Sequence, residues 1–177
     1  MSESNQDKVY TGVFPIAPTP FTDSGELDLD SQRRVLDCMV DQGVDGICIL
    51  ANYSEQFALS DAERETLLDL CTEHVAGRVP IIVTCSHYAT QIAVERARRA
   101  EQAGAAMIMM MPPYHGALIK ADDTGIFEQF AALDDAISIP IMVQDAPLSG
   151  INLSIPLLVK LSQELPTVSY FKIEMPG

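Results

Sequence analysis

The sequence predicts an α/β fold of the (β/α)8 TIM-barrel family, with about six βα units in this chain. Short apolar segments alternate along the chain with longer amphipathic segments. Strands that are apolar on both faces and separated by helices form a parallel sheet that helices cover on both sides. Polar or aromatic residues follow several of these segments, as they do at the carboxyl ends of barrel strands. No G-x-G-x-x-G motif follows the first segment, which disfavours a doubly wound dinucleotide-binding sheet.

The first two units are predicted from four features in the N-terminal part of the chain. The sequence GVFPIA predicts a strand at residues 12–17, and GICIL predicts a second strand at residues 46–50. Apolar residues at helical spacing predict a helix at residues 29–42. A second helix is expected to begin at Ser60, because Glu63 stands three residues later and completes a capping box.

The middle of the chain repeats this order. The sequence VPIIVT predicts a strand at residues 79–84, and AMIMM predicts another at residues 106–110. Residues 90–103 have the pattern of a helix, and Gly104 follows as a residue suited to end it.

The last units follow the same rules. Helices are predicted at residues 126–137 and 155–165, the second of them after Ser154, a residue type that caps helices. Short apolar runs predict strands at residues 141–143 and 168–172. Because a closed barrel needs eight units and six fit the sequence, we expect residues 1–177 to form a single, incomplete barrel domain, with residues 1–9 as a flexible tail.

Composition and charge exclude several classes of function. The net charge of −14 and the pI of about 4.3 argue against nucleic acid or an anionic membrane as partner. No apolar run approaches the roughly 20 residues of a membrane span, and the N-terminus MSESNQDK has no signal-peptide pattern. We therefore expect a cytoplasmic protein. Neither the cysteines nor the histidines have a metal-binding spacing, so no metal is expected; they are Cys38, Cys48, Cys71, Cys85, His74, His87 and His115.

Lys172 is the residue that most needs an explanation. It is the only one of the four lysines that stands at the end of an apolar strand. One interpretation is that its side chain extends from the strand end into solvent. The other is that an apolar pocket lowers its pKa, so that the neutral amine attacks a ketone and forms a Schiff base.

Several motifs, in order, resemble one family of Schiff-base enzymes. They are PTPF followed by D-x-G-E-L-D, then GVDGI, MPPYH, D-A-P and finally Y-F-K-I-E. From GVFPIAPTPF to its end, the chain resembles the dihydrodipicolinate synthase and N-acetylneuraminate lyase family, whose members are (β/α)8 barrels. The resemblance implies that Lys172 forms the imine with a small 2-keto acid, that no other cofactor is needed, and that the protein forms homotetramers.

The chain departs from the family pattern after two strands. The family commonly has G-T-T-G-E or G-S-T-G-E where this chain has A-N-Y-S-E, so the resemblance assigns substrate binding to Asn52, Tyr53 and Ser54. The family's tyrosine in Y-N-x-P is replaced by Gln144. Glutamine forms hydrogen bonds but is no general acid or base at neutral pH. We expect Gln144 to position the imine or a hydroxyl group.

Three further residues are candidates for moving protons or contacting substrate. The family often has P-Y-Y where this chain has P-Y-H, so the tyrosine that reaches a neighbouring subunit's site corresponds to Tyr114 or His115. His87, which follows the third predicted strand, has an ordinary pKa near neutrality and is a candidate proton carrier. A hydrogen-bonded loop histidine is the alternative for His87.

These departures favour dehydration over carbon–carbon cleavage. Retro-aldol cleavage needs a base at the C4 hydroxyl, which is the task of the family's tyrosine. The motifs around the departures resemble a branch of the family, the L-2-keto-3-deoxyarabonate dehydratases, whose product is 2,5-dioxopentanoate (α-ketoglutaric semialdehyde). We therefore expect a Schiff-base hydro-lyase acting on a 2-keto-3-deoxy sugar acid. A pyruvate-dependent aldolase and an inert, truncated chain are the alternatives.

Overall fold

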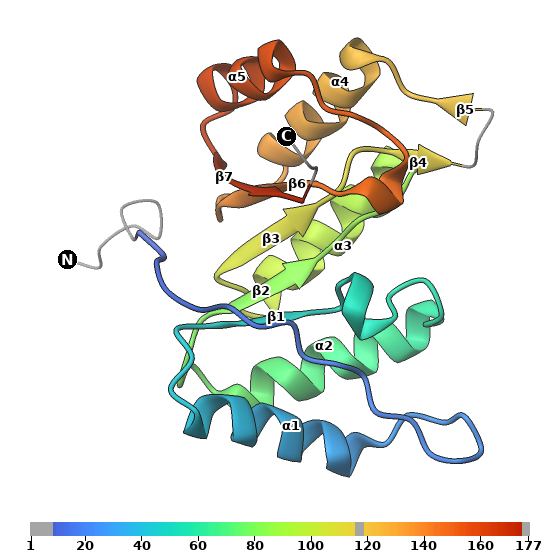
Figure 1. Cartoon of the computed structure of the whole chain (residues 1–177), viewed down its shortest axis with the longest axis vertical. Coiled ribbons are helices and arrows are strands. Elements are labelled where there is room, and N and C mark those ends of the chain that lie inside the picture. Colours follow the sequence, from blue (N-terminus) through green and yellow to red (C-terminus); the bar gives the residue numbers. More distant parts are fainter. Residues whose placement is uncertain (1–8, 116–118, 175–177) are drawn as a thin grey trace. The chain divides into compact units, whose positions relative to one another are not determined.

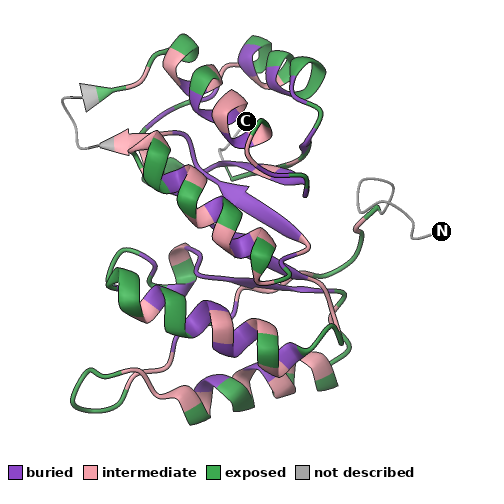
Figure 2. Cartoon of the chain, turned by 180° about the vertical axis from the view of Figure 1, so that it is seen from behind, coloured by how far each residue is buried: buried purple, intermediate pink, exposed green. Residues whose placement is uncertain are grey.

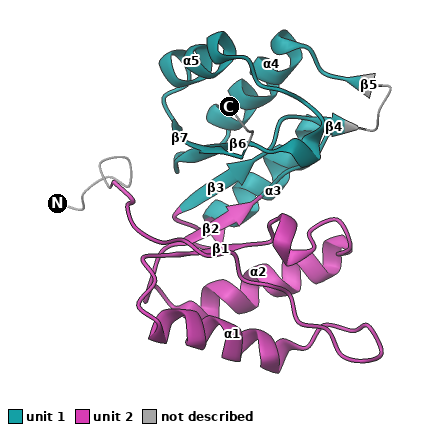
Figure 3. Cartoon of the chain, viewed as in Figure 1, with its two compact units in different colours: residues 1–7, 85–101, 107–177 teal, residues 8–84, 102–106 magenta. Residues whose placement is uncertain are grey.

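The computed structural model describes residues 9–115 and 119–174. Nearly all of the predicted N-terminal tail therefore lies outside the described residues. The chain divides into two compact units, shown in different colours in Figure 3. They comprise the described parts of Cys85–Glu101 and Met107–Gly177 (unit 1), and of Lys8–Thr84 and Gln102–Ala106 (unit 2). The single incomplete barrel domain stays a prediction.

Unit 2 contains two parallel strands with two helices beside them (Figure 1). Strand β1, Ile47–Ile49, pairs in register with β2, Ile81–Thr84, and both strands are completely buried. The predicted strand at residues 12–17 is reduced to one parallel bridge between Ile16 and Cys48. Pro15, Pro18 and Pro20 have no N–H group to donate, so the ladder cannot extend along this segment.

Helix α1 matches its predicted range to within one residue, and α2 begins where the sequence predicts. Helix α1, Leu29–Asp41, starts after Asp28, whose side chain accepts a hydrogen bond from the Ser31 N–H, and Gly43 follows it in a left-handed conformation. Helix α2, Asp61–Val75, starts with the predicted capping box between Ser60 and Glu63. Between β1 and α2 lies a short 3-10 turn, η2, at Asn52–Ser54.

Unit 1 contains three parallel strands paired in the order β3, β6, β7. Strand β3 covers Met107–Met110, β6 covers Ile141–Asp145, and β7 covers Val168–Ile173. Their connecting helices are α3 (Thr90–Gln102), α4 (Asp123–Asp134) and α5 (Ile155–Glu164). A 3-10 turn, η3, at Pro147–Ser149 precedes α5.

Several features of unit 1 differ from the sequence prediction. Strand β6 extends to Asp145 instead of ending at residue 143, and α4 ends at Asp134 instead of residue 137. Helix α4 begins three residues earlier than expected, because the Asp122 side chain accepts a hydrogen bond from the Gly125 N–H at 2.8 Å and caps it there. A small antiparallel pair, β4 (Tyr114–His115) and β5 (Ile119–Lys120), follows β3. Strands of two residues are too short for a periodicity, so the sequence did not predict them.

Burial separates β7 from the other strands of the sheet (Figure 2). Every residue of β3 is buried, whereas β7 alternates between more and less covered positions. Phe171 is 37% exposed and Ile173 is 54% exposed. Val168, Tyr170 and Lys172 occupy the more covered face of β7. Among the described residues, no helix is long and apolar enough to cross a membrane.

Candidate active site

The candidate catalytic residues of unit 1 meet where β6 and β7 end. The register of the two strands places Gln144 opposite Lys172. Because parallel strands end at the same edge of a sheet, both side chains belong to the carboxyl end, where barrels carry their chemistry. The sequence predicted these two residues separately, and the structure brings them together.

Lys172 is held by a carboxylate. Its Nζ donates to Oε1 of Glu174 in an ion pair, and each of the two side chains is 30% exposed. The sequence had offered two interpretations, a side chain extended into solvent and an amine in an apolar pocket. The structure shows a third arrangement, in which a partly covered ammonium group has an anionic partner.

Glu174 is a candidate site residue to which the sequence analysis assigned no role. Its N–H donates to the Asp145 carbonyl oxygen at 2.9 Å, which fixes the backbone after β7. Its Oε2 accepts a hydrogen bond from Nε2 of Gln144 at 3.3 Å. The signal was present, because residues two apart in an extended chain share a face, and Lys172 and Glu174 are two apart. One carboxylate therefore joins the two predicted residues.

Gln144 is deeply buried and only half satisfied. The residue is 1% exposed, and its Oε1 has no hydrogen-bond partner among the described residues. A buried acceptor without a partner costs about 1–3 kcal/mol relative to a satisfied one. Such an atom is suited to accept a hydrogen bond from a hydroxyl group that enters the site.

Asp145 occupies the next position on β6 and therefore points to the opposite face of the strand. It is 5% exposed, it accepts a hydrogen bond from the Leu153 N–H, and its Oδ1 has no partner among the described atoms. Burial raises the pKa of this carboxyl group above its ordinary value, and the Leu153 N–H offsets part of that rise. Asp145 thus contacts the segment after η3, while its carbonyl holds Glu174.

A second set of candidates in unit 1 follows β2 and β3. The His87 and Tyr88 rings stack with centroids 4.3 Å apart, and Tyr114 meets Tyr88 edge-on at 6.4 Å. Nδ1 of His87 accepts a hydrogen bond from the Ala89 N–H at 2.9 Å, so the proton of the neutral ring lies on Nε2. The hydroxyl of Tyr114 donates to the Ser86 carbonyl oxygen at 3.5 Å. The His115 side chain lies outside what the structure describes.

The three predicted substrate-binding residues of unit 2 form the η2 turn and differ strongly in exposure. Tyr53 is 78% exposed, whereas Ser54 is 1% exposed. Asn52 is intermediate, and its Oδ1 accepts a hydrogen bond from Nε2 of Gln56 at 2.5 Å. The Ser54 N–H donates to the Ala51 carbonyl oxygen at 2.9 Å. Ser54 is therefore engaged within the protein, and Tyr53 is the member most open to solvent.

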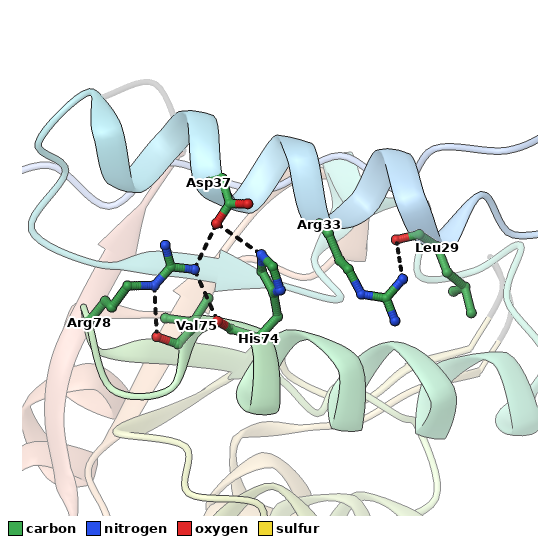
Figure 4. Close-up of polar contacts among 6 residues, drawn as sticks. All are labelled: Leu29, Arg33, Asp37, His74, Val75 and Arg78. Carbon is green, nitrogen blue, oxygen red and sulfur yellow. Dashed lines mark hydrogen bonds and ion pairs between the residues drawn. The ribbon is translucent and has the colours of Figure 1, made fainter.

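Unit 2 also contains a polar cluster of a different kind, between α1 and the end of α2 (Figure 4). Oδ1 of Asp37 accepts from Nε2 of His74 at 2.9 Å and from Nη2 of Arg78 at 2.8 Å. The Arg78 hydrogen bond, followed by that of His74, lowers the pKa of the Asp37 carboxyl group. Arg78 also donates to the carbonyl oxygens of Val75 and His74. The cluster ties two helices together.

Comparison with known proteins places this geometry in a family. The model of the dihydrodipicolinate synthetase family matches residues 9–173. The chain belongs to this family. It is 58% identical over 168 residues to the L-2-keto-3-deoxyarabonate dehydratase of Azospirillum brasilense. This match covers 95% of this chain and 54% of that protein. It is 32% identical to a 4-hydroxy-tetrahydrodipicolinate synthase of Bartonella quintana, over 89% of this chain and 53% of that protein.

The chain also resembles solved structures of family members. A putative dihydrodipicolinate synthetase from Pseudomonas aeruginosa superposes with a TM-score of 0.87 at 32% identity, covering 93% of this chain and 56% of that one. YagE, a prophage protein of the family from E. coli K12 in complex with pyruvate, superposes with a TM-score of 0.90 at 26% identity. This match covers 96% of this chain and 56% of that one. The predicted family and fold class are confirmed. The chain spans about half the length of the relatives it matches.

Proposed function

We propose that the protein containing this chain is a Schiff-base hydro-lyase that dehydrates a 2-keto-3-deoxy sugar acid. The observation that carries the proposal is the cluster of Lys172, Glu174 and Gln144 at the carboxyl ends of β6 and β7. The amine of Lys172 supplies a nucleophile and the carboxylate of Glu174 supplies a proton carrier. The buried amide of Gln144 supplies a hydrogen-bond partner for a substrate hydroxyl. The family relationship supports this assignment, and the 58% identity to a dehydratase supports dehydration.

The substrate we propose is L-2-keto-3-deoxyarabonate, and the product is 2,5-dioxopentanoate with one water. Nζ of Lys172 forms a bond to C2 of the ketone and one water leaves, which gives an iminium ion. The iminium ion acidifies C3. Removal of a C3 proton gives an enamine, which expels the C4 hydroxyl as water once that group gains a proton. Proton shifts then convert C5 into an aldehyde, and hydrolysis releases the product and the free amine.

Glu174 is the proton carrier that fits these steps, because its carboxylate contacts Nζ of Lys172. Gln144 accepts a hydrogen bond from a substrate hydroxyl through Oε1 and keeps Glu174 oriented through Nε2. His87, Tyr114 and His115 remain candidates for further proton transfers. Asn52 and Tyr53 are proposed to contact the substrate carboxylate, which a chain of net charge −14 must hold locally.

Dehydration is preferred over aldol cleavage because of Gln144. Cleavage of the C3–C4 bond requires a base at the C4 hydroxyl, and an amide does not take up a proton at neutral pH.

By family relationship we also propose that the enzyme needs no cofactor beyond the lysine imine, works in the cytoplasm in pentose catabolism, and assembles as a homotetramer. A related solved structure is described as a monomeric variant of dihydrodipicolinate synthase, so the assembly needs its own measurement.

Borohydride trapping tests the proposal. The complete protein that contains this chain is incubated with L-2-keto-3-deoxyarabonate or pyruvate, reduced, digested and examined by mass spectrometry. We expect an adduct on Lys172 and, without reduction, accumulation of the semialdehyde. Free pyruvate as the main product from the sugar acid would identify an aldolase instead. An adduct that is absent, or that forms on another lysine, would overturn the Schiff-base proposal.

A further inference from the structure

We infer that Thr19 and Ser54 are positioning residues that hold the Asn52–Tyr53 segment in the orientation required for substrate binding. The inference rests on the proposed function, in which that segment contacts the carboxylate. It adds Thr19, which lies 35 residues away in sequence, and gives Ser54 a role different from direct contact with substrate.

Two hydrogen bonds join Ser54 to residues 17–19, and we call this pair of bonds the clasp. The Ser54 hydroxyl donates to the Ala17 carbonyl oxygen at 2.6 Å, and the Thr19 hydroxyl donates to the Ser54 carbonyl oxygen at 2.8 Å. Thr19 is 7% exposed and Ser54 is 1% exposed, so water does not compete for either bond. Ser54 is thus fixed at both its side chain and its backbone to one segment, residues 17–19.

The backbone on both sides of η2 explains why the segment needs a clasp. Leu50 precedes it with φ of 54° and Glu55 follows it with φ of 58°. Both are non-glycine residues in the left-handed region, which costs roughly 1 kcal/mol or more for each residue. A segment bounded by two such residues does not keep its conformation through local preference. Tertiary contacts must hold it, and the two clasp bonds are contacts of that kind.

Packing around Ser54 leaves a small void. A small cavity lies behind Ser54, and its lining includes Thr19, Leu50 and Cys71. Close-packed side chains would resist a shift of the turn, but a void on this side leaves room for one. Loss of the clasp therefore lets the turn move inward and withdraw Asn52 and Tyr53. Because these residues contact bound substrate, the change affects substrate affinity more than the chemical step at Lys172.

The test is the substitution Thr19→Val in the complete protein, with KM and kcat measured for the keto acid. We expect KM to rise roughly 10-fold, the effect of one hydrogen bond in a buried site, with kcat within about 3-fold of the unsubstituted protein. Thr19→Ser keeps the hydroxyl and is expected to restore KM to within about 2-fold. The matched control is Thr72→Val, which removes a hydroxyl bonded to the Leu68 carbonyl within α2 of the same unit and is expected to leave KM unchanged.

Ser54→Ala provides a second variant if Thr19→Val does not fold. It removes the bond to Ala17 but keeps the carbonyl that Thr19 binds, so we expect a KM increase that is not additive with that of Thr19→Val. An unchanged KM in both variants, an equal rise in Thr72→Val, or a loss confined to kcat would overturn the inference. If the unsubstituted protein forms no borohydride adduct on Lys172, the proposed function itself is wrong, whatever the variants do.

Discussion

The two carboxylate clusters of the chain differ in how completely their polar atoms are satisfied. Asp37 in unit 2 accepts hydrogen bonds from the side chains of His74 and Arg78, and Arg78 also donates to two carbonyl oxygens. In unit 1, Glu174 joins Lys172 to Gln144, yet nearby buried oxygens of Gln144 and Asp145 have no partner among the described residues. Proteins rarely leave buried polar atoms unpaired. The Asp37 carboxylate is paired within the protein, whereas the cluster in unit 1 has one unpaired buried acceptor among the described residues, Oε1 of Gln144.

Exposure sharpens the contrast between the clusters. The Asp37 side chain is 44% exposed, where an ion pair contributes little to stability, whereas Gln144 is 1% exposed. A surface cluster can lose a member at small cost, because water replaces the lost hydrogen bonds. A buried residue such as Gln144 cannot be lost as cheaply, because no water replaces its hydrogen bonds. We therefore expect substitutions in the two regions to change different properties of the protein.

The largest expected effect is that of Lys172→Arg. Arginine keeps the positive charge beside Glu174, but its guanidinium group does not form an imine at neutral pH. We expect the borohydride adduct to disappear and kcat to fall by at least about 10³-fold, since the covalent route is lost. Thermal unfolding measured by circular dichroism should change little. Activity retained to within 10-fold would mean that the cluster is only a structural tie like that of Asp37.

Gln144→Leu should have the next largest effect. Leucine removes both the donor to Glu174 and the free acceptor, and we expect kcat to fall roughly 10- to 100-fold, the range of one or two lost hydrogen bonds in a buried site. Steady-state kinetics measures the change. Gln32→Leu is the matched control, since Gln32 is also buried, at 2% exposed, but stands on α1 of unit 2. An equal loss of kcat in both variants would mean that burial, and not chemistry, explains Gln144.

Local signals in the sequence account for most of the fold. The capping box at Ser60 and the glycine after α1 mark helix ends because the chemistry that ends a helix is contained in a few neighbouring residues. The first predicted strand was the exception, since its prolines were visible but their effect on pairing depends on what lies beside them. The β4 and β5 pair was too short to leave a pattern.

The candidate site was less predictable, because its contacts join residues that are distant in sequence. Lys172 and Gln144 were predicted individually from the family resemblance, but their pairing depends on the register between β6 and β7. Glu174 stands in the motif Y-F-K-I-E, two residues from Lys172, but its contact with Gln144, 30 residues away, depends on the pairing of β6 with β7. The clasp between Thr19 and Ser54 likewise depends on a contact across 35 residues.

Asp145→Asn compares the buried Asp145 carboxyl group, which follows Gln144 on β6, with the exposed Asp37 carboxyl group of unit 2. Burial raises the pKa of Asp145 in the folded protein, so the folded state binds the proton more tightly than the unfolded state. Stability therefore falls as pH rises from the ordinary pKa of aspartate through the raised one. Asparagine keeps an acceptor for the Leu153 N–H and has no charge. We expect a gain of about 1 kcal/mol in the free energy of unfolding at pH 7, measured by urea denaturation.

Asp37→Asn is the matched control, and its sign is opposite. The pKa of Asp37 is lowered in the folded state, so its contribution to stability is present above the ordinary pKa of aspartate and is lost as pH falls through the lowered value. This variant should be less stable at pH 7 and should converge with the unsubstituted protein in acid. A loss of stability in Asp145→Asn at pH 7 would show that the Asp145 carboxylate has a favourable partner, and the contrast between the buried Asp145 and the exposed Asp37 would fail.

The smallest expected effect lies beside the Asp37 cluster, at Ala76. This residue caps α2 in the left-handed region, with φ of 49° and ψ of 39°, and it is exposed. Glycine has no Cβ and adopts this conformation without steric cost. We expect Ala76→Gly to raise the free energy of unfolding by about 0.5 kcal/mol and to leave kcat unchanged. The matched substitution Ala62→Gly, in the right-handed first turn of the same helix, should lower it by about 0.5–1 kcal/mol. If Ala76→Gly is destabilising as well, the left-handed cap is not the conformation in solution, and the turn that carries Arg78 back to Asp37 has another geometry.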